Sequence, residues 1–326
     1  MITAFELGMI YAIMALGVYL TFRILNFPDL TVDGSFTTGA ATAAVLITAG
    51  VDPFLATAAA FVVGTAAGWI TGMLHTKGGI NGLLAGILTM IGLYSINLRI
   101  MGGANVPLLG EDTVVSALRD LVEVGWESVA VLALVAVVFK LLLDWYLHTD
   151  NGLALQATGD NEQMIRSFAV STDRMKILGL MLSNGLVALC GAVVAQYQGF
   201  ADISMGIGLI LVGLASVIVG QALFGAKSVV RATLAVVLGA VVYRLAIQLA
   251  LNLGLDPNDM KLMSAVLVVA ALLLPQWKGF SKLAAWRRAR AASTTAGSTA
   301  GSVEATASSR AEAVEESAQA AGRKEG

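Results

Sequence analysis

The sequence predicts an all-α integral membrane protein that crosses the bilayer eight or nine times. Apolar residues make up 57% of the 326 residues, whereas charged residues make up only 13%. Soluble domains carry about 25% charged residues, so this composition excludes an ordinary soluble globular protein. Long apolar runs recur along the chain, and one polar interval, His148 to Lys176, interrupts them.

A transmembrane helix needs about 20 largely apolar residues to cross about 30 Å of hydrocarbon. By this measure the predicted spans are 3–25, 34–50, 53–75, 80–99, 124–147, 176–198, 207–224, 229–251 and 261–276. The second and the last are short, which leaves the count at eight or nine. The first carries Glu6 and Arg23 and lacks a basic leader, so we expect a retained helix instead of a cleaved signal peptide.

The distribution of Lys and Arg predicts the orientation, because short cytoplasmic loops retain positive charge. One set of connections holds Arg23, Lys77, Arg166, Arg174, Lys176, Lys227, Arg231, Lys278, Lys282, Arg287, Arg288 and Arg290. The opposite set holds only Arg99, Arg119 and Lys261. We therefore expect the C-terminus and the 148–176 interval in the cytoplasm. An odd number of spans would place the N-terminus outside.

The sequence divides into a transmembrane domain, residues 1–276, and two C-terminal segments. Residues 277–290 mix tryptophan and phenylalanine with basic residues, which fits either a segment lying at the lipid headgroups or a simple stop-transfer flank. Residues 291–326 lack large apolar residues and are expected to form a disordered cytoplasmic tail.

Small residues and a short internal repeat indicate how the spans are arranged. Glycines recur every four residues at Gly64, Gly68 and Gly72, and again at Gly78, Gly82 and Gly86, which predicts close helix packing. Residues 27–32, FPDLTV, resemble residues 200–205, FADISM, five predicted spans later. An odd displacement would make the two copies an inverted repeat with broken helices, although six positions can also match by chance.

Polar residues inside apolar spans usually face a partner or a water-filled path. Asn97, Asn184, Gln196, Gln221, Tyr243, Arg244 and Gln248 are such residues. Arg244 could balance an anionic substrate or an acid such as Asp202, or it could extend outward or pair structurally. Lys140 and Asp144, four residues apart, predict a local ion pair.

The sequence lacks the residues of familiar catalytic and metal sites. Cys190 is its one cysteine and it has two histidines, which excludes disulfides and cysteine or histidine metal clusters. No nucleic-acid partner is indicated. Residues 220–228 fail as a nucleotide-binding loop, because Ala226 separates the second glycine from Lys227. If ATP drives this protein, another subunit must bind it.

The 148–176 interval contains a predicted short helix. Asp160 has the position of an N-cap with Gln163 at the third helical position, and the helix would run from Asn161 to about Val170. Met164, Ile165 and Phe168 would form a small apolar surface on it. The helix could lie against the bilayer or dock into a groove of a partner. A second cap is expected at 171–174.

Several motifs together resemble one family. They are 157–164, ATGDNEQM; 169–174, AVSTDR; 26–35, NFPDLTVDGS; 182–185, LSNG; 195–196, AQ; and 199–208, GFADISMGIG. They resemble ABC importer permeases of the branched-chain amino acid permease type, and more closely the tryptophan/tyrosine branch. The resemblance covers about residues 5–275.

This resemblance implies a type II importer fold and a coupling role for Asp160, Asn161, Met164, Ile165 and Phe168. It also implies a substrate path between two permease copies, for which the candidate residues are Asn26, Asp29, Asp33, Asn97, Asn184, Gln196, Asp202 and Arg244.

The expected partners are a second permease copy, lipid, ABC ATPase subunits that bind ATP and Mg, and an extracytoplasmic binding protein. The acidic outer segment 101–123 is the candidate for docking that protein. No cofactor is expected in this chain, and the expected location is the bacterial inner membrane. An amino acid, aromatic in the nearest branch, is the implied solute, while sugars and nucleosides stay open.

Two other functional classes fit the sequence less well. A secondary transporter driven by an ion gradient would need an intramembrane carboxylate, which the span centres do not offer convincingly. A membrane-embedded enzyme would need a catalytic constellation, and the sequence contains none that is recognisable. The sequence therefore favours an importer permease without its own ATPase site.

Overall fold

Helices form nearly all of the regular structure in the computed structural model. It describes residues 2–121, 126–253, 262, 264–266, 268 and 269. The longer helices are α1 (Ile2–Tyr19), α2 (Thr31–Thr48), α3 (Pro53–Thr76), α4 (Gly82–Met101), α6 (Trp126–Leu147), α9 (Thr172–Gln198), α10 (Leu209–Phe224) and α11 (Val229–Asn252). The shorter elements are the π-helix η1 (Leu20–Ile24), β1 (Asn105–Pro107), α5 (Val114–Leu121), α7 (Asp150–Asp160), α8 (Glu162–Ser167) and β2 (Phe200–Asp202).

The eight longer helices lie at the first eight predicted spans. Six of them are long and apolar enough to cross a membrane: α1 continued by η1, α3, α4, α6, α9 and α11. α10 is apolar but has only 16 residues. α2 has 18 residues and is rich in threonine and alanine, and it begins at Thr31, earlier than expected. The predicted span 261–276 and the segments 277–290 and 291–326 lie mostly or entirely outside the described residues.

Short polar side chains define where the helices begin. The Asp52 carboxylate accepts hydrogen bonds from the backbone amides of Phe54 and Leu55 at 2.9 and 3.2 Å, and Pro53 occupies the first turn of α3. Asn81 caps α4 in the same way. These residues satisfy amides that a helix leaves unpaired at its N-terminus. The caps explain the sharp connections between α2, α3 and α4.

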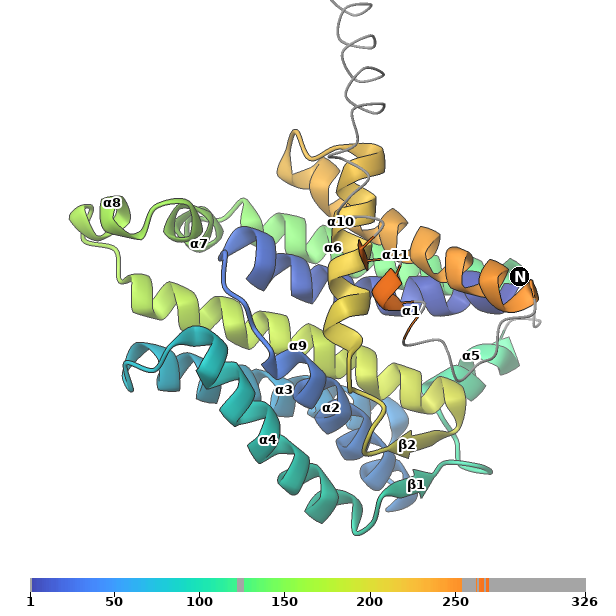
Figure 1. The fold of residues 1–326 in the computed structure, drawn as a ribbon. Helices are drawn as coiled ribbons and strands as arrows, with labels where there is room; N and C mark the ends of the chain where they lie inside the picture. The colour runs from blue at the N-terminus through green and yellow to red at the C-terminus, as the bar shows by residue number, and fades with distance from the viewer. Residues whose placement is uncertain (1, 122–125, 254–261, 263, 267, 270–326) are drawn as a thin grey trace, which may run out of the picture. The chain divides into compact units, whose positions relative to one another are not determined.

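α9 lies at the centre of the bundle, in contact with α1, α2 and α3 (Figure 1). Glycines bring the backbones together: a Cβ on Gly39 would lie 1.9 Å from the Ala188 carbonyl oxygen, and one on Gly68 would lie 2.2 Å from that of Leu180. The predicted close packing of the 64–72 glycines is therefore confirmed. The 78–86 glycines do not form a second such interface, because Gly82 and Gly86 pack against the α1–α2 connection.

The two halves of the chain contain the same order of elements, and their first helices run in opposite directions. In the first half α1 and η1 lead through a break to α2 and α3, and in the second half α9 leads through a break to α10 and α11. Ser183 donates a hydrogen bond to the Gly17 carbonyl at 2.7 Å, and Tyr197 donates one to Glu6 at 2.6 Å. The start of α1 thus lies beside the end of α9, and the two helices are antiparallel (Figure 1). This is the arrangement expected of an inverted repeat.

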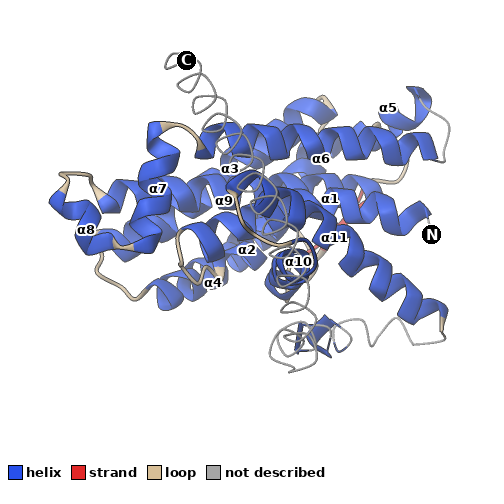
Figure 2. Cartoon of the chain, turned by 90° about the horizontal axis from the view of Figure 1, so that it is seen from above, coloured by secondary structure: helices blue, strands red, loops and turns tan. Residues whose placement is uncertain are grey.

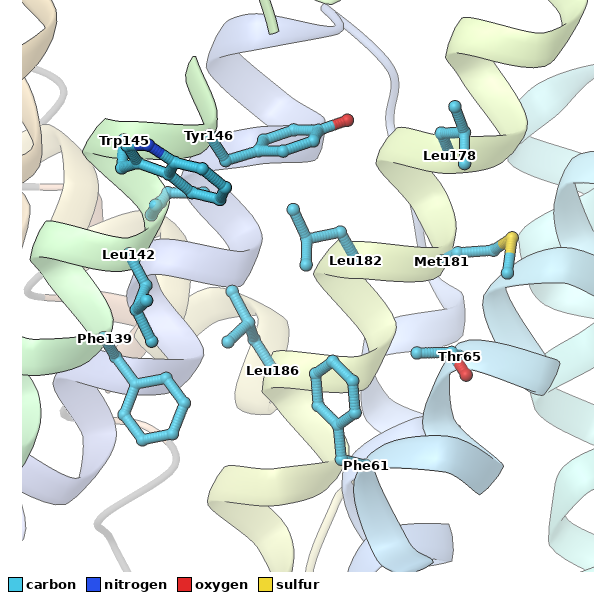
Figure 3. A pocket seen from close by; sticks show the side chains of 11 residues that line it. Phe61, Thr65, Phe139, Leu142, Trp145, Tyr146, Leu178, Met181, Leu182 and Leu186 are labelled. Atoms are coloured by element: carbon cyan, nitrogen blue, oxygen red, sulfur yellow. The ribbon is translucent and has the colours of Figure 1, made fainter. Parts of the chain in front are cut away.

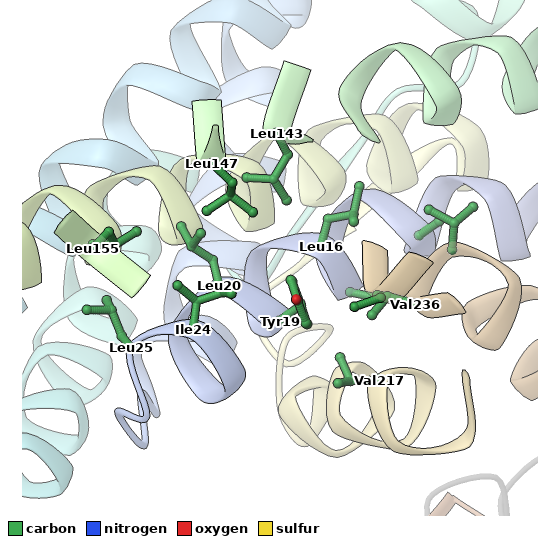
Figure 4. Packing of buried hydrophobic residues seen from close by; sticks show 14 of the residues in the cluster. Leu16, Tyr19, Leu20, Ile24, Leu25, Leu143, Leu147, Leu155, Val217 and Val236 are labelled. Carbon is green, nitrogen blue, oxygen red and sulfur yellow. The ribbon is translucent and has the colours of Figure 1, made fainter. Parts of the chain in front are cut away.

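A hydrophobic cluster joins the first helix to later elements. Leu16 and Leu20 pack with residues of α6, α7, α10 and α11, including Leu147, Leu155 and Val236 (Figure 4). Figure 2 shows α7 and α8 together at one end of the bundle, with α5 at the opposite end. The short strands β1 and β2 pair in antiparallel fashion and connect the end of α4 to the second break.

We expect Gly39→Ala to destabilise the protein, because its added methyl group would overlap the Ala188 carbonyl oxygen. Overpacking of this kind costs about 1–3 kcal/mol of unfolding free energy. Thermal unfolding of the detergent-solubilised chain would show a lower midpoint. Gly92→Ala is the matched control, since a Cβ there has nothing within 4 Å. Equal midpoints for the two variants would contradict this packing.

Candidate functional site

The two helix breaks meet through one carboxylate. Asp33, in the first turn of α2, accepts hydrogen bonds from the backbone amides of Gly208 at 2.7 Å and Ile210 at 2.8 Å. These amides lie at the start of α10, where a helix has unpaired N–H groups and a positive dipole end. Gly206 allows the approach, since a Cβ there would lie 2.1 Å from the Asp33 carbonyl oxygen. A residue of the first half therefore caps the broken helix of the second.

A second polar network fastens the first break to α9. Asn184 donates to Asp29 at 2.7 Å and accepts from Ser35 at 2.7 Å, while the Thr31 amide donates to Asp29 at 2.9 Å. The four side chains are completely buried. Asp29 and Asn184 are therefore bound to each other inside the protein, and neither lines a cavity described here.

A partly polar pocket lies beside the Asp33 contact. It has a volume of about 380 Å³ and is lined by α2, α4 and the turn after β2. Asp33 and Asn97, both predicted path residues, line it together with Tyr94. Asn97 is only 1% exposed, and its Oδ1 has no hydrogen-bond partner among the described residues. A buried acceptor without a partner costs about 1–3 kcal/mol, so this oxygen is suited to a donor supplied by a ligand.

A cavity of about 400 Å³ between α3, α6 and α9 has a different character (Figure 3). Its walls are almost wholly apolar, with Phe61, Phe139 and Leu182 among them, and the Tyr146 hydroxyl lies near one end. Such a surface offers few groups to orient a polar solute. Its composition resembles a lipid-facing groove more than a path for solutes.

The structure places the other predicted path residues apart from the pocket. Gln196 donates to Thr57 at 2.8 Å and accepts from the Val114 amide at 2.8 Å, so it fixes α3 and α5 to the end of α9. Asp202 accepts from the Ser204 amide at 2.8 Å, and hydrogen bonding by Ser204 lowers the pKa of its carboxyl group. Both residues organise the connections at the end of the bundle that carries α5, β1 and β2.

Arg244 does not pair with Asp202. Its guanidinium carbon lies 3.9 Å from the centre of the Tyr11 ring, a cation–π contact between α11 and α1. No ion pair of Arg244 with a carboxylate occurs among the residues that the structure describes. The expected Lys140–Asp144 ion pair does form, with a separation of 2.5 Å.

Glu6 is a structural residue that the sequence analysis did not assign. It is 7% exposed and accepts hydrogen bonds from Ser128 and Tyr197. The carboxylate thereby ties α1 to α6 and α9. The sequence could have indicated this role, because Glu6 is an acid inside the first apolar segment and a buried charge requires partners.

The 148–176 interval contains two helices: α8 corresponds to the predicted helix, and α7 precedes it and was not predicted. Thr149 accepts from the Gly152 amide at 3.3 Å and starts α7, which continues to Asp160. The cap of α8 is Asn161, which accepts from the Met164 amide at 3.0 Å, so the prediction of Asp160 as N-cap was wrong. α8 also ends sooner than expected, at Ser167. Ser171 precedes α9 without a side-chain capping bond.

α8 and the residue that follows it, Phe168, expose two apolar side chains. Met164 is 51% exposed and Phe168 is 70% exposed, whereas Ile165 is 8% exposed and faces the protein. Glu162 anchors this helix to α9 by accepting from Lys176 at 2.8 Å, and it also accepts from Arg166 of the same helix at 2.8 Å. The hydrogen bond from Lys176 is the main cause that lowers the pKa of Glu162.

α7 contacts the first break directly. A Cβ on Gly159 would lie 1.8 Å from the Ile24 carbonyl oxygen, at the end of η1. Asn26 follows with a left-handed φ of 52° and lines a cavity of about 320 Å³ together with Glu162 and Lys176. Asn26 therefore lies at the α7–α8 end, apart from Asp33 and Asn97.

The antiparallel halves, their broken helices and the internal polar contacts define a multi-pass membrane transport protein. The family model described as "Branched-chain amino acid transport system / permease component" matches residues 1–273. The chain belongs to this family of ABC transporter permeases, and it is a multi-pass protein of the inner membrane. The family assignment replaces the alternative of a transporter driven by an ion gradient.

Two relatives show the range of this similarity. The chain is 46% identical over 266 residues to the tyrosine transport system permease protein of Clostridioides difficile (strain R20291), covering 81% of this chain and 88% of the relative. It is 27% identical over 278 residues to the ribose import permease protein RbsC of Escherichia coli (strain K12), covering 82% of each. Among solved structures, PsaBC from Streptococcus pneumoniae in complex with Fab has a TM-score of 0.49 and 16% identity, covering 82% of this chain and 89% of that one.

The Glu162 contacts predict a pH dependence for the anchoring of α8. Because the folded-state pKa of Glu162 lies below its ordinary value of 4.5, its stabilising effect is present above that pH and is lost as the pH falls through the folded-state pKa. Hydrogen–deuterium exchange of the α8 amides, corrected for intrinsic rates, measures this effect. Glu162→Gln should show weak protection even at neutral pH. Wild-type protection in this variant would contradict the anchoring role.

Proposed function

We propose that this chain is the membrane-spanning subunit of an ATP-driven importer for a small solute, an amino acid and specifically an aromatic one. Two copies would form the path, an extracytoplasmic binding protein would deliver the solute, and ATPase subunits would engage α8. The exposure of Met164 on α8 and of Phe168 at its C-terminal end, with the helix anchored to the bundle, is the observation that carries this proposal. The 46% identity to a tyrosine transport system permease supports the solute class.

The proposed mechanism is alternating access driven from α8. Closure of the partner ATPases, which bind the ATP and Mg, would displace α8 and, with it, α7. Gly159 would pass this displacement to Ile24, because their backbones are too close to move independently. The first break would then shift relative to α10 through Asp33 and open the path toward one side. No cofactor of this chain enters the cycle.

The opposite end of the bundle is the proposed docking surface for the binding protein. The segment from Met101 to Glu123 contains β1 and α5, and its acidic residues include Glu111 and Asp112. Figure 2 shows α5 at the end remote from α7 and α8, as a route through the membrane requires. The excess of basic residues near α7 and α8 supports a cytoplasmic location for that end and for the C-terminus.

Replacing both Met164 and Phe168 with Asp should uncouple the protein from its ATPase without harming membrane insertion. The two side chains are exposed, so charge costs little in the isolated chain but would meet an apolar partner surface. Co-purified ATPase and ATP-dependent uptake of L-tyrosine into proteoliposomes should both fall by about tenfold or more.

Gln163→Asp is the matched control, because Gln163 is also exposed on α8 but does not belong to the apolar surface. This variant should keep its ATPase and its uptake. Undiminished co-purification and uptake in the Met164→Asp, Phe168→Asp variant would exclude α8 as the coupling element.

A further inference from the structure

We propose that the pocket between α2, α4 and the turn after β2 binds the transported amino acid, with its ammonium group toward Asp33 and Asn97 and its side chain toward Tyr94. The inference rests on the proposed function and adds the site and the orientation of the solute. This pocket is the one of about 380 Å³ beside the Asp33 contact.

The polar residues that line the pocket offer hydrogen-bond acceptors. Asn97 is almost completely buried and its Oδ1 has no partner within the described part of the chain, while its Nδ2 faces the Gly34 carbonyl at 3.5 Å. Asp33, next to Gly34, adds a half-buried carboxylate. Its two oxygens already accept from the Gly208 and Ile210 amides, but an ionised carboxylate has about four acceptor sites, so it can also attract an ammonium group. An ammonium group has three donors and no acceptor, so it complements this set. A sugar hydroxyl would match it less well, since the carboxylate favours a positive charge.

The rest of the lining is mostly apolar and includes an aromatic ring. Tyr94 lies one turn before Asn97 on α4 and is 49% exposed. Ile91 and Ile207 are 58% and 55% exposed and complete this wall with Met90. A planar side chain can stack on the tyrosine ring and contact the isoleucines, which is the environment that an aromatic group prefers.

The position of the pocket favours a transport role over a purely structural cavity. Its walls include Asp33, which caps α10, and Ile207, which lies in the turn that this cap holds. A relative movement of the two breaks would therefore change the pocket directly. Inverted-repeat transporters bind their solutes at such junctions of discontinuous helices.

Thiol accessibility tests whether the pocket faces a water-filled path. The native Cys190 is completely buried, so Tyr94→Cys supplies the reactive thiol. In the full complex with its ATPase and binding protein in nanodiscs, a hydrophilic methanethiosulfonate reagent should label this thiol, and L-tyrosine with ATP should slow the labelling. Leu141→Cys is the control, because Leu141 is 55% exposed on α6 and lies outside the pocket; it should stay unlabelled. Equal labelling of the two thiols, or labelling that L-tyrosine does not change, would overturn the assignment.

Substitution of Asn97 tests the acceptor. Asn97→Leu should lower L-tyrosine uptake about tenfold, the effect of losing one hydrogen bond to a charged group. The variant should keep its co-purified ATPase, since Asn97 lies in α4 and not in α8. Wild-type uptake in Asn97→Leu would refute the site alone. Absence of uptake of any amino acid by the wild-type complex would instead refute the proposed solute class, and the site with it.

Discussion

The Asp33 carboxylate at the N-terminus of α10 is the contact on which the arrangement of the two halves depends. A helix that begins inside a membrane leaves amide groups that lipid cannot satisfy. Here the amides of Gly208 and Ile210 are satisfied by a side chain that lies about half the chain away in sequence. The broken helix of the second half is therefore held by the first half, and a shift of one break acts directly on the other.

The remaining contacts connect this junction to both ends of the bundle. Toward α8, the Asp29–Asn184 bond holds the first break on α9, and the Gly159–Ile24 contact brings α7 against the end of η1. Toward β1 and β2, buried Glu6 joins α1 to α6 and α9, and buried Gln196 joins α9 to α3 and α5. Rigid polar contacts at both ends and a solute-sized pocket at the junction fit a protein that changes its access while its helices stay intact.

Features set by local chemistry could be predicted from the sequence. The spans follow from apolar runs because backbone groups in lipid must be bonded within helices. The Lys140–Asp144 pair follows from a four-residue spacing, and the break after the first span follows from the polar residues and proline around Asp29. The family resemblance was also readable, since its motifs occur in order along the chain.

Features set by long-range packing could not be predicted. Asp160 and Asn161 are equally good caps by residue type, but α7 continues through Asp160, which leaves Asn161 as the cap of α8. Arg244 carries no local information about which partner it meets, so its contact with Tyr11 had to be seen. The same is true of Asp33 and Gly208, which are brought together only by the crossing of two broken helices.

The most direct test of this account measures amide exchange at the start of α10 in the full-length protein when Asp33 is replaced. In Asp33→Leu, the amides of Gly208 and Ile210 should exchange about tenfold faster than in the wild type, because their acceptor is gone. Asp33→Asn, which keeps one acceptor oxygen, should give an intermediate rate, and the amides of α6 should not change. Unaltered protection at Gly208 and Ile210 in Asp33→Leu would contradict the claim that the first half of the chain holds the second in place.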